Sequence, residues 1–142
     1  MKESEFSRKL INYFNSLPDT FFFKEHGSQF GSGIPDLIGS YNGEPFGLEL
    51  KVYDIPKRDS TIMDITKDVT PSQRHKMKAM AVGGWTCFIG VLLRPTNIII
   101  WVDYQASPKL TKSEFETLSM HTSPEPDFPT SIKHLNSLMK RA

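Results

Sequence analysis

Apolar positions near the start of the chain recur at the spacing of a helix. They fall on one face of the segment 3–17, and Pro18-Asp19 ends the run. The apolar residues of this segment are Phe6, Leu10, Tyr13, Phe14 and Leu17. An aromatic run at residues 21–23 predicts a short strand, and a polar, glycine-rich loop at residues 26–33 is expected after it.

A β-hairpin is the next predicted element. Residues 34–41 and 44–52 predict two strands joined by Asn42-Gly43. Both residues of this dipeptide tolerate the positive φ that a type I′ turn requires, so the turn is expected to contain two residues.

Beyond the hairpin the pattern changes. Residues 53–69 are polar and charged without clear periodicity, which predicts a long loop or lid. Thr70 and Gln73 then form a capping box with Pro71 at the first helical position, so a helix is expected to begin there. Gly83-Gly84 is expected to end it.

The last third of the chain predicts two strands and two helices. The strands are expected at residues 85–93 and 97–102, and the second is apolar enough to be buried on both faces. Thr111 and Glu114 form another capping box ahead of a helix at residues 112–120.

A proline-rich, extended segment at residues 123–129 precedes the last predicted helix. That helix has apolar residues at helical spacing and is expected to pack on the body; they are Ile132, Leu135, Leu138 and Met139. The predicted order α-β-β-β-α-β-β-α-α indicates a mixed α/β protein with a central sheet. We expect one domain over residues 1–142, with a core at about 1–102 and a C-terminal extension at about 103–142.

Composition narrows the functional classes. The single cysteine, Cys87, excludes an internal disulfide framework and suits a reducing cytoplasm, where it is expected as a buried small side chain. The sequence has neither a signal-peptide pattern nor an apolar run long enough to cross a membrane, so no membrane association is expected. Zinc motifs, a phosphate-binding P-loop and dinucleotide glycine spacing are also absent, so no nucleotide cofactor is expected.

Net charge is only +1, so a polyanionic partner cannot be inferred from the total. Residues 51–78 contain seven Lys or Arg against four Asp, a local net charge of +3. A solvated surface segment would have the same composition.

Candidate chemistry is concentrated in the hairpin. With a two-residue turn, paired positions sum to 85, so Asp36 is predicted directly opposite Glu49. Paired Cβ atoms lie about 4.5–5.5 Å apart, and like charges there are destabilising unless something lies between them. Mg²⁺ prefers oxygen ligands, uses one or two carboxylates and leaves room for substrate phosphate.

Strand alternation places Lys51 on the same face as Glu49. An ammonium group there can hold the attacking water and offset charge on phosphorus, while the metal polarises the phosphoryl oxygen. A bulge would shift the register but would leave Glu49 and Lys51 on one face.

These residues resemble a known nuclease signature. Ile34-Pro35-Asp36, then twelve residues, then Glu49-Leu50-Lys51 is similar to the PD-(D/E)XK motif. The preceding helix and glycine-rich loop, and the following Thr-Pro-Ser-Gln helix, are similar to the VRR-NUC branch and to archaeal-type Holliday junction resolvases. The resemblance covers residues 1 to about 102.

The resemblance implies a restriction-endonuclease-like α-β-β-β-α-β core with a mixed central sheet and a short C-terminal helical extension. It implies a DNA endonuclease that uses Mg²⁺, with Mn²⁺ as a substitute, and that cleaves branched DNA in recombination and repair. A four-way junction has two scissile strands, which would imply a homodimer.

Residue roles follow from the matched positions. The resemblance assigns catalysis to Asp36, Glu49, Lys51 and Gln73. It assigns metal binding to Glu3, Asp36, Glu49 and Leu50. Glu3 is chosen because apolar residues follow it by three and seven positions, with Glu5 as the second choice; both also favour a helix N-terminus. The capping role of Gln73 is compatible with an active-site role.

DNA contacts are assigned to His26 and Ser28 in the glycine-rich loop and to Lys57 and Arg58 in the segment after the hairpin. For both pairs, a solvated surface loop without DNA contact is the more frequent explanation. Two other classes stay open: a non-catalytic DNA-binding or interaction module with the nuclease fold, and a nuclease subunit that acts only within a larger complex. Intact Asp36, Glu49 and Lys51 argue against the first.

Overall fold

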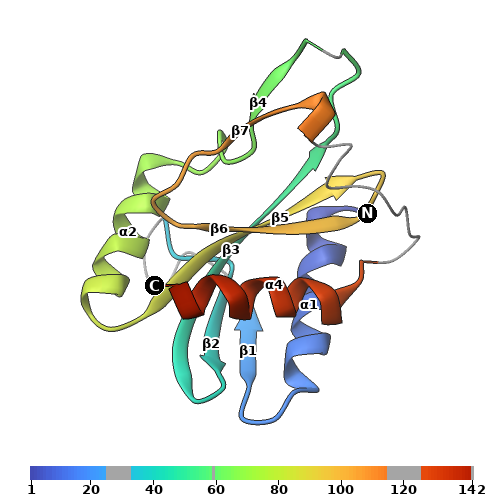
Figure 1. The fold of residues 1–142 in the computed structure, drawn as a ribbon. Coiled ribbons are helices and arrows are strands. Elements are labelled where there is room, and N and C mark those ends of the chain that lie inside the picture. Colours follow the sequence, from blue (N-terminus) through green and yellow to red (C-terminus); the bar gives the residue numbers. More distant parts are fainter. Residues whose placement is uncertain (25–32, 59, 115–125, 142) are drawn as a thin grey trace.

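The protein folds around a central sheet with helices on both faces (Figure 1). The computed structural model describes residues 1–24, 33–58, 60–114 and 126–141. The helices are α1 (Glu3–Asn15), α2 (Pro71–Val82) and α4 (Phe128–Arg141). The strands are β1 (Phe21–Lys24), β2 (Leu37–Tyr41), β3 (Glu44–Asp54), β4 (Ile62–Asp64), β5 (Thr86–Arg94), β6 (Ile98–Asp103) and β7 (Lys109–Thr111).

The main sheet has five strands in the order β1-β2-β3-β5-β6. Strands β3 and β5 are parallel, and the other neighbours are antiparallel. The connection between β3 and β5 contains β4 and α2, as a parallel pair requires a crossover. The predicted mixed sheet is therefore confirmed. A separate two-stranded sheet joins β4 to β7.

Each face of the sheet is covered by different helices. On one face, Phe6 and Leu10 of α1 and Leu135 of α4 are fully buried against Leu48 and Leu50 of β3. Burying such a side chain stabilises the fold by roughly 1.5–3 kcal/mol. On the other face, α2 packs through its buried Met77. Since side chains alternate along β3, Glu49 and Lys51 project toward the α2 face.

The turn predicted for the hairpin and the capping box predicted for α2 are both confirmed. Asn42 and Gly43 have φ values of 51° and 83°, as a type I′ turn requires. The Gln73 amide nitrogen donates to Thr70 Oγ1 at 3.1 Å, and the Thr70 amide nitrogen donates to Gln73 Oε1 at 2.9 Å. These two bonds are the predicted capping box, and α2 begins at Pro71.

The prediction of a long loop at residues 53–69 is partly wrong. Strand β3 continues to Asp54, β4 follows at residues 62–64, and Ile65 and Val69 are buried. The pairing of Ile62 with Thr111 depends on residues far apart in the chain. Such a pairing leaves no local periodicity for a sequence pattern to reveal.

Burial of the last strand pair also differs from the prediction. Strand β5, rather than β6, is the strand buried almost throughout, whereas Ile98 and Ile100 of β6 are only half-buried. The reason is position: β5 lies between β3 and β6, while β6 is the outer strand of the described sheet.

Toward the C-terminus, Glu114 and Thr111 exchange the capping-box hydrogen bonds at 3.2 and 3.3 Å. Residues 115–125 lie outside the described part, and with them most of the predicted helix at 112–120. The extended segment predicted to reach residue 129 ends earlier, because α4 already begins at Phe128. Pro129 fits there, since the first turn of a helix tolerates proline. None of the described helices is both long enough and apolar enough to cross a membrane.

Candidate active site

Asp36 and Glu49 meet where β2 separates from β3. The ladder follows the predicted register from Tyr41 opposite Glu44 to Leu37 opposite Leu48, and it ends there. Asp36 and Glu49 are therefore not the predicted ladder pair. Instead, Asp36 Oδ2 accepts a hydrogen bond from the Leu50 amide nitrogen at 2.9 Å, and the carboxyl group of Glu49 is hydrogen-bonded to Asp36.

Glu49 is a buried carboxyl group with an unused oxygen. Its side chain is 1% exposed, and Oε2 has no hydrogen-bond partner among the described residues. Burial, followed by the hydrogen bond and the charge of Asp36, raises the pKa of Glu49 well above its usual range, and Lys51 opposes this shift. Burying a polar atom without a hydrogen-bond partner costs free energy, so the Glu49 carboxyl group is stabilised by binding either a proton or a cation.

Lys51 lies near Glu49, its neighbour on the same face of β3, and near Glu3 of α1. Its positive charge acts on Glu49 and on Glu3, and its side chain is half-buried. Burial and the neighbouring Asp36 raise the pKa of Glu3, whereas Lys51 and Lys24 lower it. The structure therefore brings together Glu3, Asp36, Glu49 and Lys51, which are distributed over the first 51 residues of the chain.

A pocket of about 250 Å³ lies between the start of α1 and the loop before β2. It is lined by Glu3, Ser4, Ser7, Lys24 and Asp36. Glu5 is engaged elsewhere, in an ion pair with Lys9 at 3.7 Å. Of these two first-turn glutamates, Glu3 is the one that lines this pocket together with Asp36.

Lys24 is a pocket residue that the sequence reasoning missed. It ends β1 and pairs with Leu37, the residue after Asp36. No feature of the sequence indicates this position, because it depends on the pairing of β1 with β2.

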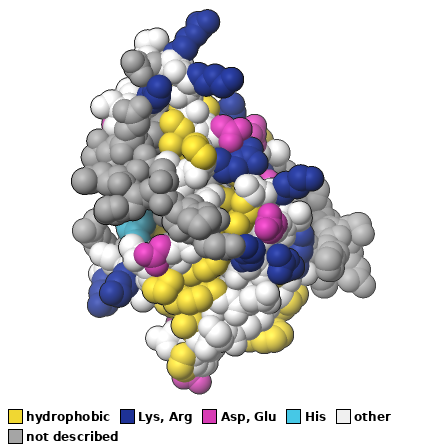
Figure 2. Space-filling model, turned by 90° about the vertical axis from the view of Figure 1, so that its right-hand side faces the viewer, with side chains coloured by type: hydrophobic (Ala, Val, Ile, Leu, Met, Phe, Trp, Pro, Cys, Tyr) yellow, Lys and Arg dark blue, Asp and Glu magenta, His cyan; other side chains and the backbone are white. Residues whose placement is uncertain are grey.

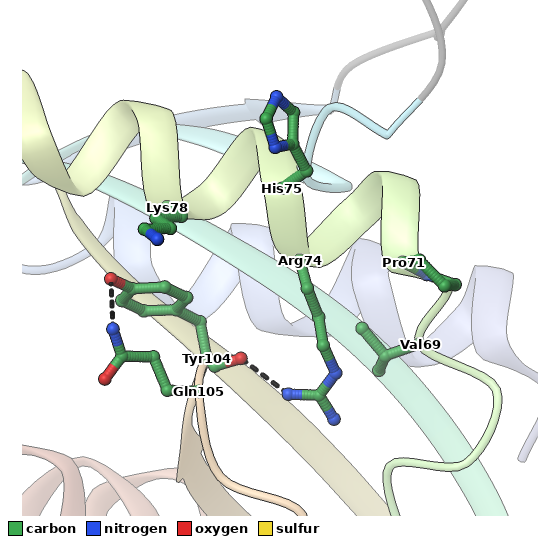
Figure 3. Close-up of a pocket in the computed structure, with 7 residues that line it drawn as sticks. All are labelled: Val69, Pro71, Arg74, His75, Lys78, Tyr104 and Gln105. Carbon is green, nitrogen blue, oxygen red and sulfur yellow. Dashed lines mark hydrogen bonds between the residues drawn. The ribbon is translucent and has the colours of Figure 1, made fainter.

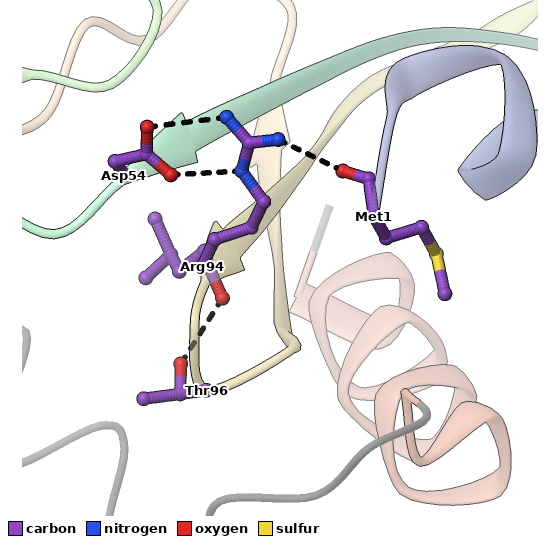
Figure 4. Close-up of polar contacts among 5 residues, drawn as sticks. Met1, Asp54, Arg94 and Thr96 are labelled. Atoms are coloured by element: carbon purple, nitrogen blue, oxygen red, sulfur yellow. Dashed lines mark hydrogen bonds and ion pairs between the residues drawn. The ribbon is translucent and has the colours of Figure 1, made fainter.

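Arg94 ties the start of α1 to the ends of β3 and β5 (Figure 4). Its guanidinium donates to the Asp54 carboxylate at 2.8 and 3.1 Å and to the Met1 carbonyl oxygen at 3.1 Å. The adjoining turn is closed by Thr96 Oγ1, which donates to the Leu93 carbonyl oxygen at 3.1 Å. An exposed ion pair of this kind contributes at most about 1 kcal/mol to stability. These contacts of Arg94 instead fix the position of Met1, which lies two residues before Glu3.

The donor set fits a divalent cation that needs few protein ligands. Within the described ranges, no three His, Cys, Asp or Glu side chains form a ready-made metal cluster. Mg²⁺, however, is usually held by one or two carboxylates and keeps several waters. The unused Glu49 Oε2 beside Asp36 meets that requirement. Leu50 has only its backbone carbonyl oxygen to offer, because its side chain is buried in the core.

The other predicted site residues are Gln73, Lys57, Arg58, His26 and Ser28. Gln73 is held in the capping box, at the start of a helix that lies against Gly33; a Cβ at Gly33 would come within 2.6 Å of the Ser72 carbonyl oxygen. Lys57 and Arg58 are exposed and lie beyond the end of β3. The predicted DNA contacts His26 and Ser28 fall outside the described residues.

We expect the metal-free protein to lose stability as pH rises. Between the usual pKa of Glu49, near 4.5, and its raised value, the folded protein holds one proton more than the unfolded chain. The free energy of unfolding then falls with pH, by up to about 1.4 kcal/mol per pH unit. Glu49→Gln removes this contribution, so its stability should depend less steeply on pH than that of the unmodified protein. Denaturant unfolding in chelator at several pH values measures the difference. If the free energy of unfolding changed equally steeply with pH in both proteins, the raised pKa would not belong to Glu49.

Comparison with known proteins supports the fold. Neither the family models nor the curated proteins include a match to this chain. Among solved structures, the chain is similar to the Holliday junction resolvase Hjc of the archaeal hyperthermophile Archaeoglobus fulgidus. The two share 16% sequence identity with a TM-score of 0.53, over 85% of this chain and 98% of the resolvase. The predicted restriction-endonuclease-like fold is therefore confirmed.

Proposed function

We propose that this protein is a Mg²⁺-dependent DNA endonuclease that hydrolyses phosphodiester bonds in branched DNA such as four-way junctions. The observation that carries the proposal is the buried Glu49 carboxyl group, with one oxygen unused, beside Asp36 and Lys51. The fold shared with a Holliday junction resolvase adds support for the substrate class.

Each residue of the hairpin has a separate role in this proposal. Asp36 and Glu49 hold the cation, with Glu3 and the Leu50 carbonyl oxygen as further oxygen donors. When bound, Mg²⁺ supplies polarisation of a phosphoryl oxygen and lowers the pKa of a bound water. Lys51 holds the attacking water by hydrogen bonding and offsets the negative charge that develops on the phosphorus oxygens. Gln73 keeps the start of α2 in place beside the site through its capping bonds.

DNA binding must come from local charge. The total charge is +1, and on the face shown in Figure 2 the basic and acidic side chains are interspersed. We propose that Lys57 and Arg58 contact the phosphate backbone, together with His26 and Ser28. Two copies of the chain, one for each scissile strand, would cut a symmetric junction.

A cleavage assay with four matched substrates tests the proposal. We expect a junction to be cut in preference to flap, single-stranded and linear duplex DNA of the same sequence. Mg²⁺ and Mn²⁺ should support turnover, whereas Ca²⁺ should bind without supporting it, because the ligands are all oxygen.

Full activity in excess chelator would contradict metal dependence. DNA binding by the purified chain without cleavage in Mg²⁺ would favour a non-catalytic module. Cleavage that appears only after a partner protein is added would identify a subunit of a larger complex.

A further inference from the structure

A second pocket lies on the α2 face of the molecule, between that helix and the turn after β6 (Figure 3). Its volume is about 540 Å³, within the range of small-molecule sites. The side chains that face it are Val69, Pro71, Arg74, Lys78, Tyr104 and Gln105. His75 is also at its border, but its ring points to the opposite side of α2.

The pocket is electropositive. Arg74 and Lys78 are four positions apart on α2 and so share one helix face, and no Asp or Glu is among the lining residues that the structure describes. The Arg74 guanidinium donates to four uncharged oxygens, those of Tyr104, Ala106, Thr66 and Ser107, at 2.6 to 3.1 Å.

Among the described residues, no carboxylate is paired directly with this guanidinium. Asp64 is connected to Arg74 only through the Thr66 hydroxyl, which donates to Asp64 at 2.9 Å. The hydrogen bonds therefore fix the guanidinium in place but leave its charge available to an anion.

An aromatic ring and an amide complete the pocket. Tyr104 is half-buried, and its hydroxyl accepts a hydrogen bond from Gln105 Nε2 at 2.9 Å. Arg74 donates to the Tyr104 backbone carbonyl oxygen at 2.6 Å, which fixes the backbone from which the ring projects. Lys78 lies above this ring in Figure 3. A fixed aromatic ring is a platform on which an unpaired base stacks, and the nearby cations suit its phosphate.

Helix α2 connects this pocket to the candidate active site. Ser72 lies against Gly33, three residues before Asp36, and Arg74 follows Ser72 by two residues. Ser72 and Arg74 project from different sides of α2, so a DNA strand that crosses the first turn of this helix would reach from the candidate active site to the pocket.

We propose that this pocket binds one unpaired nucleotide of the substrate strand, with its base on Tyr104 and its phosphate near Lys78 and Arg74. The proposal rests on the proposed nuclease function and adds a basis for specificity. A nucleotide in a continuous duplex is stacked and paired, whereas a single strand supplies one without an unpairing cost, and a branch point supplies one where its terminal base pair is open.

Binding of a short, labelled single-stranded oligonucleotide, measured in chelator, tests the pocket directly. Tyr104→Leu should weaken binding by about 5- to 150-fold, the effect of losing one stacked base, whereas Tyr104→Phe should bind as the unmodified protein does. Lys78→Glu should also weaken binding, and its exposed position makes it safe for folding. Lys133→Ala, which removes an exposed charge from α4, is the control.

Oligonucleotides with abasic positions distinguish stacking from charge. The penalty for Tyr104→Leu should disappear when the bases are absent, and it should be small for a blunt duplex. Unchanged single-strand binding by both Tyr104→Leu and Lys78→Glu would overturn the proposal. So would an equal loss for duplex and single strand.

Cleavage assays on the same variants separate this proposal from the proposed function. If both pocket variants cut a junction in Mg²⁺ and bind single strands normally, the pocket assignment fails and the nuclease assignment stands. If the unmodified protein binds single strands through Tyr104 but cuts nothing in Mg²⁺, the pocket stands and the nuclease assignment fails.

Discussion

Replacing Lys51 with alanine is expected to lower the cleavage rate by at least about a hundredfold while metal and DNA affinities stay close to their original values. The ammonium group acts on charge that develops during the reaction, and removal of one such stabilising group typically costs a factor of about 10²–10³. Asp36 and Glu49, the proposed cation ligands, are unchanged in this variant. Single-turnover cleavage and calorimetric Mg²⁺ titration measure the two quantities separately.

Lys133→Ala is the matched control, because it removes a lysine from α4 on the opposite face of the sheet. It should cleave at the original rate. If Lys51→Ala lost Mg²⁺ affinity as well, the lysine would be organising the ligands, and its proposed role in the chemistry would be wrong.

Asp36→Asn is expected to abolish Mg²⁺-dependent cleavage and to weaken Mg²⁺ binding strongly, without destabilising the metal-free protein. An asparagine oxygen can still accept the hydrogen bond from the Leu50 amide nitrogen, and the charge that opposes ionisation of Glu49 is removed. The melting temperature in chelator should therefore be unchanged or higher. Added Mg²⁺, which stabilises a folded protein that binds it, should raise the melting temperature of the unmodified protein much more than that of the variant.

Asp19→Asn provides the matched control for this substitution. Asp19 is exposed and has a φ of 54°, a conformation that asparagine tolerates as well as aspartate does. Its cleavage and metal response should be unchanged. A lower melting temperature for metal-free Asp36→Asn, together with normal Mg²⁺-dependent cleavage, would show that Asp36 is structural.

The sequence by itself determined the features that depend on neighbouring residues. Asn42-Gly43 specifies a two-residue turn, and that turn sets the register of β2 and β3. Strand alternation then places Glu49 and Lys51 on one face, because the side-chain period of a strand is two. The capping box of Thr70 and Gln73 is equally local, and it defines the start of α2.

Apolar spacing likewise predicted α1 and α4, since each helix must bury one face to be stable. Burial of Phe6 and Leu10 in α1 and of Ile132 and Leu135 in α4 agrees with that spacing.

Tertiary structure alone decided which distant residues meet. Lys24 reaches the candidate site because β1 pairs with β2, and Tyr104 meets Arg74 because the turn after β6 lies beside α2. The pairing of β4 with β7 and the departure of Asp36 from the hairpin ladder are of the same kind. Each of these features depends on how the folded chain packs rather than on a local repeat, so it leaves no period or spacing in the sequence from which it could be predicted.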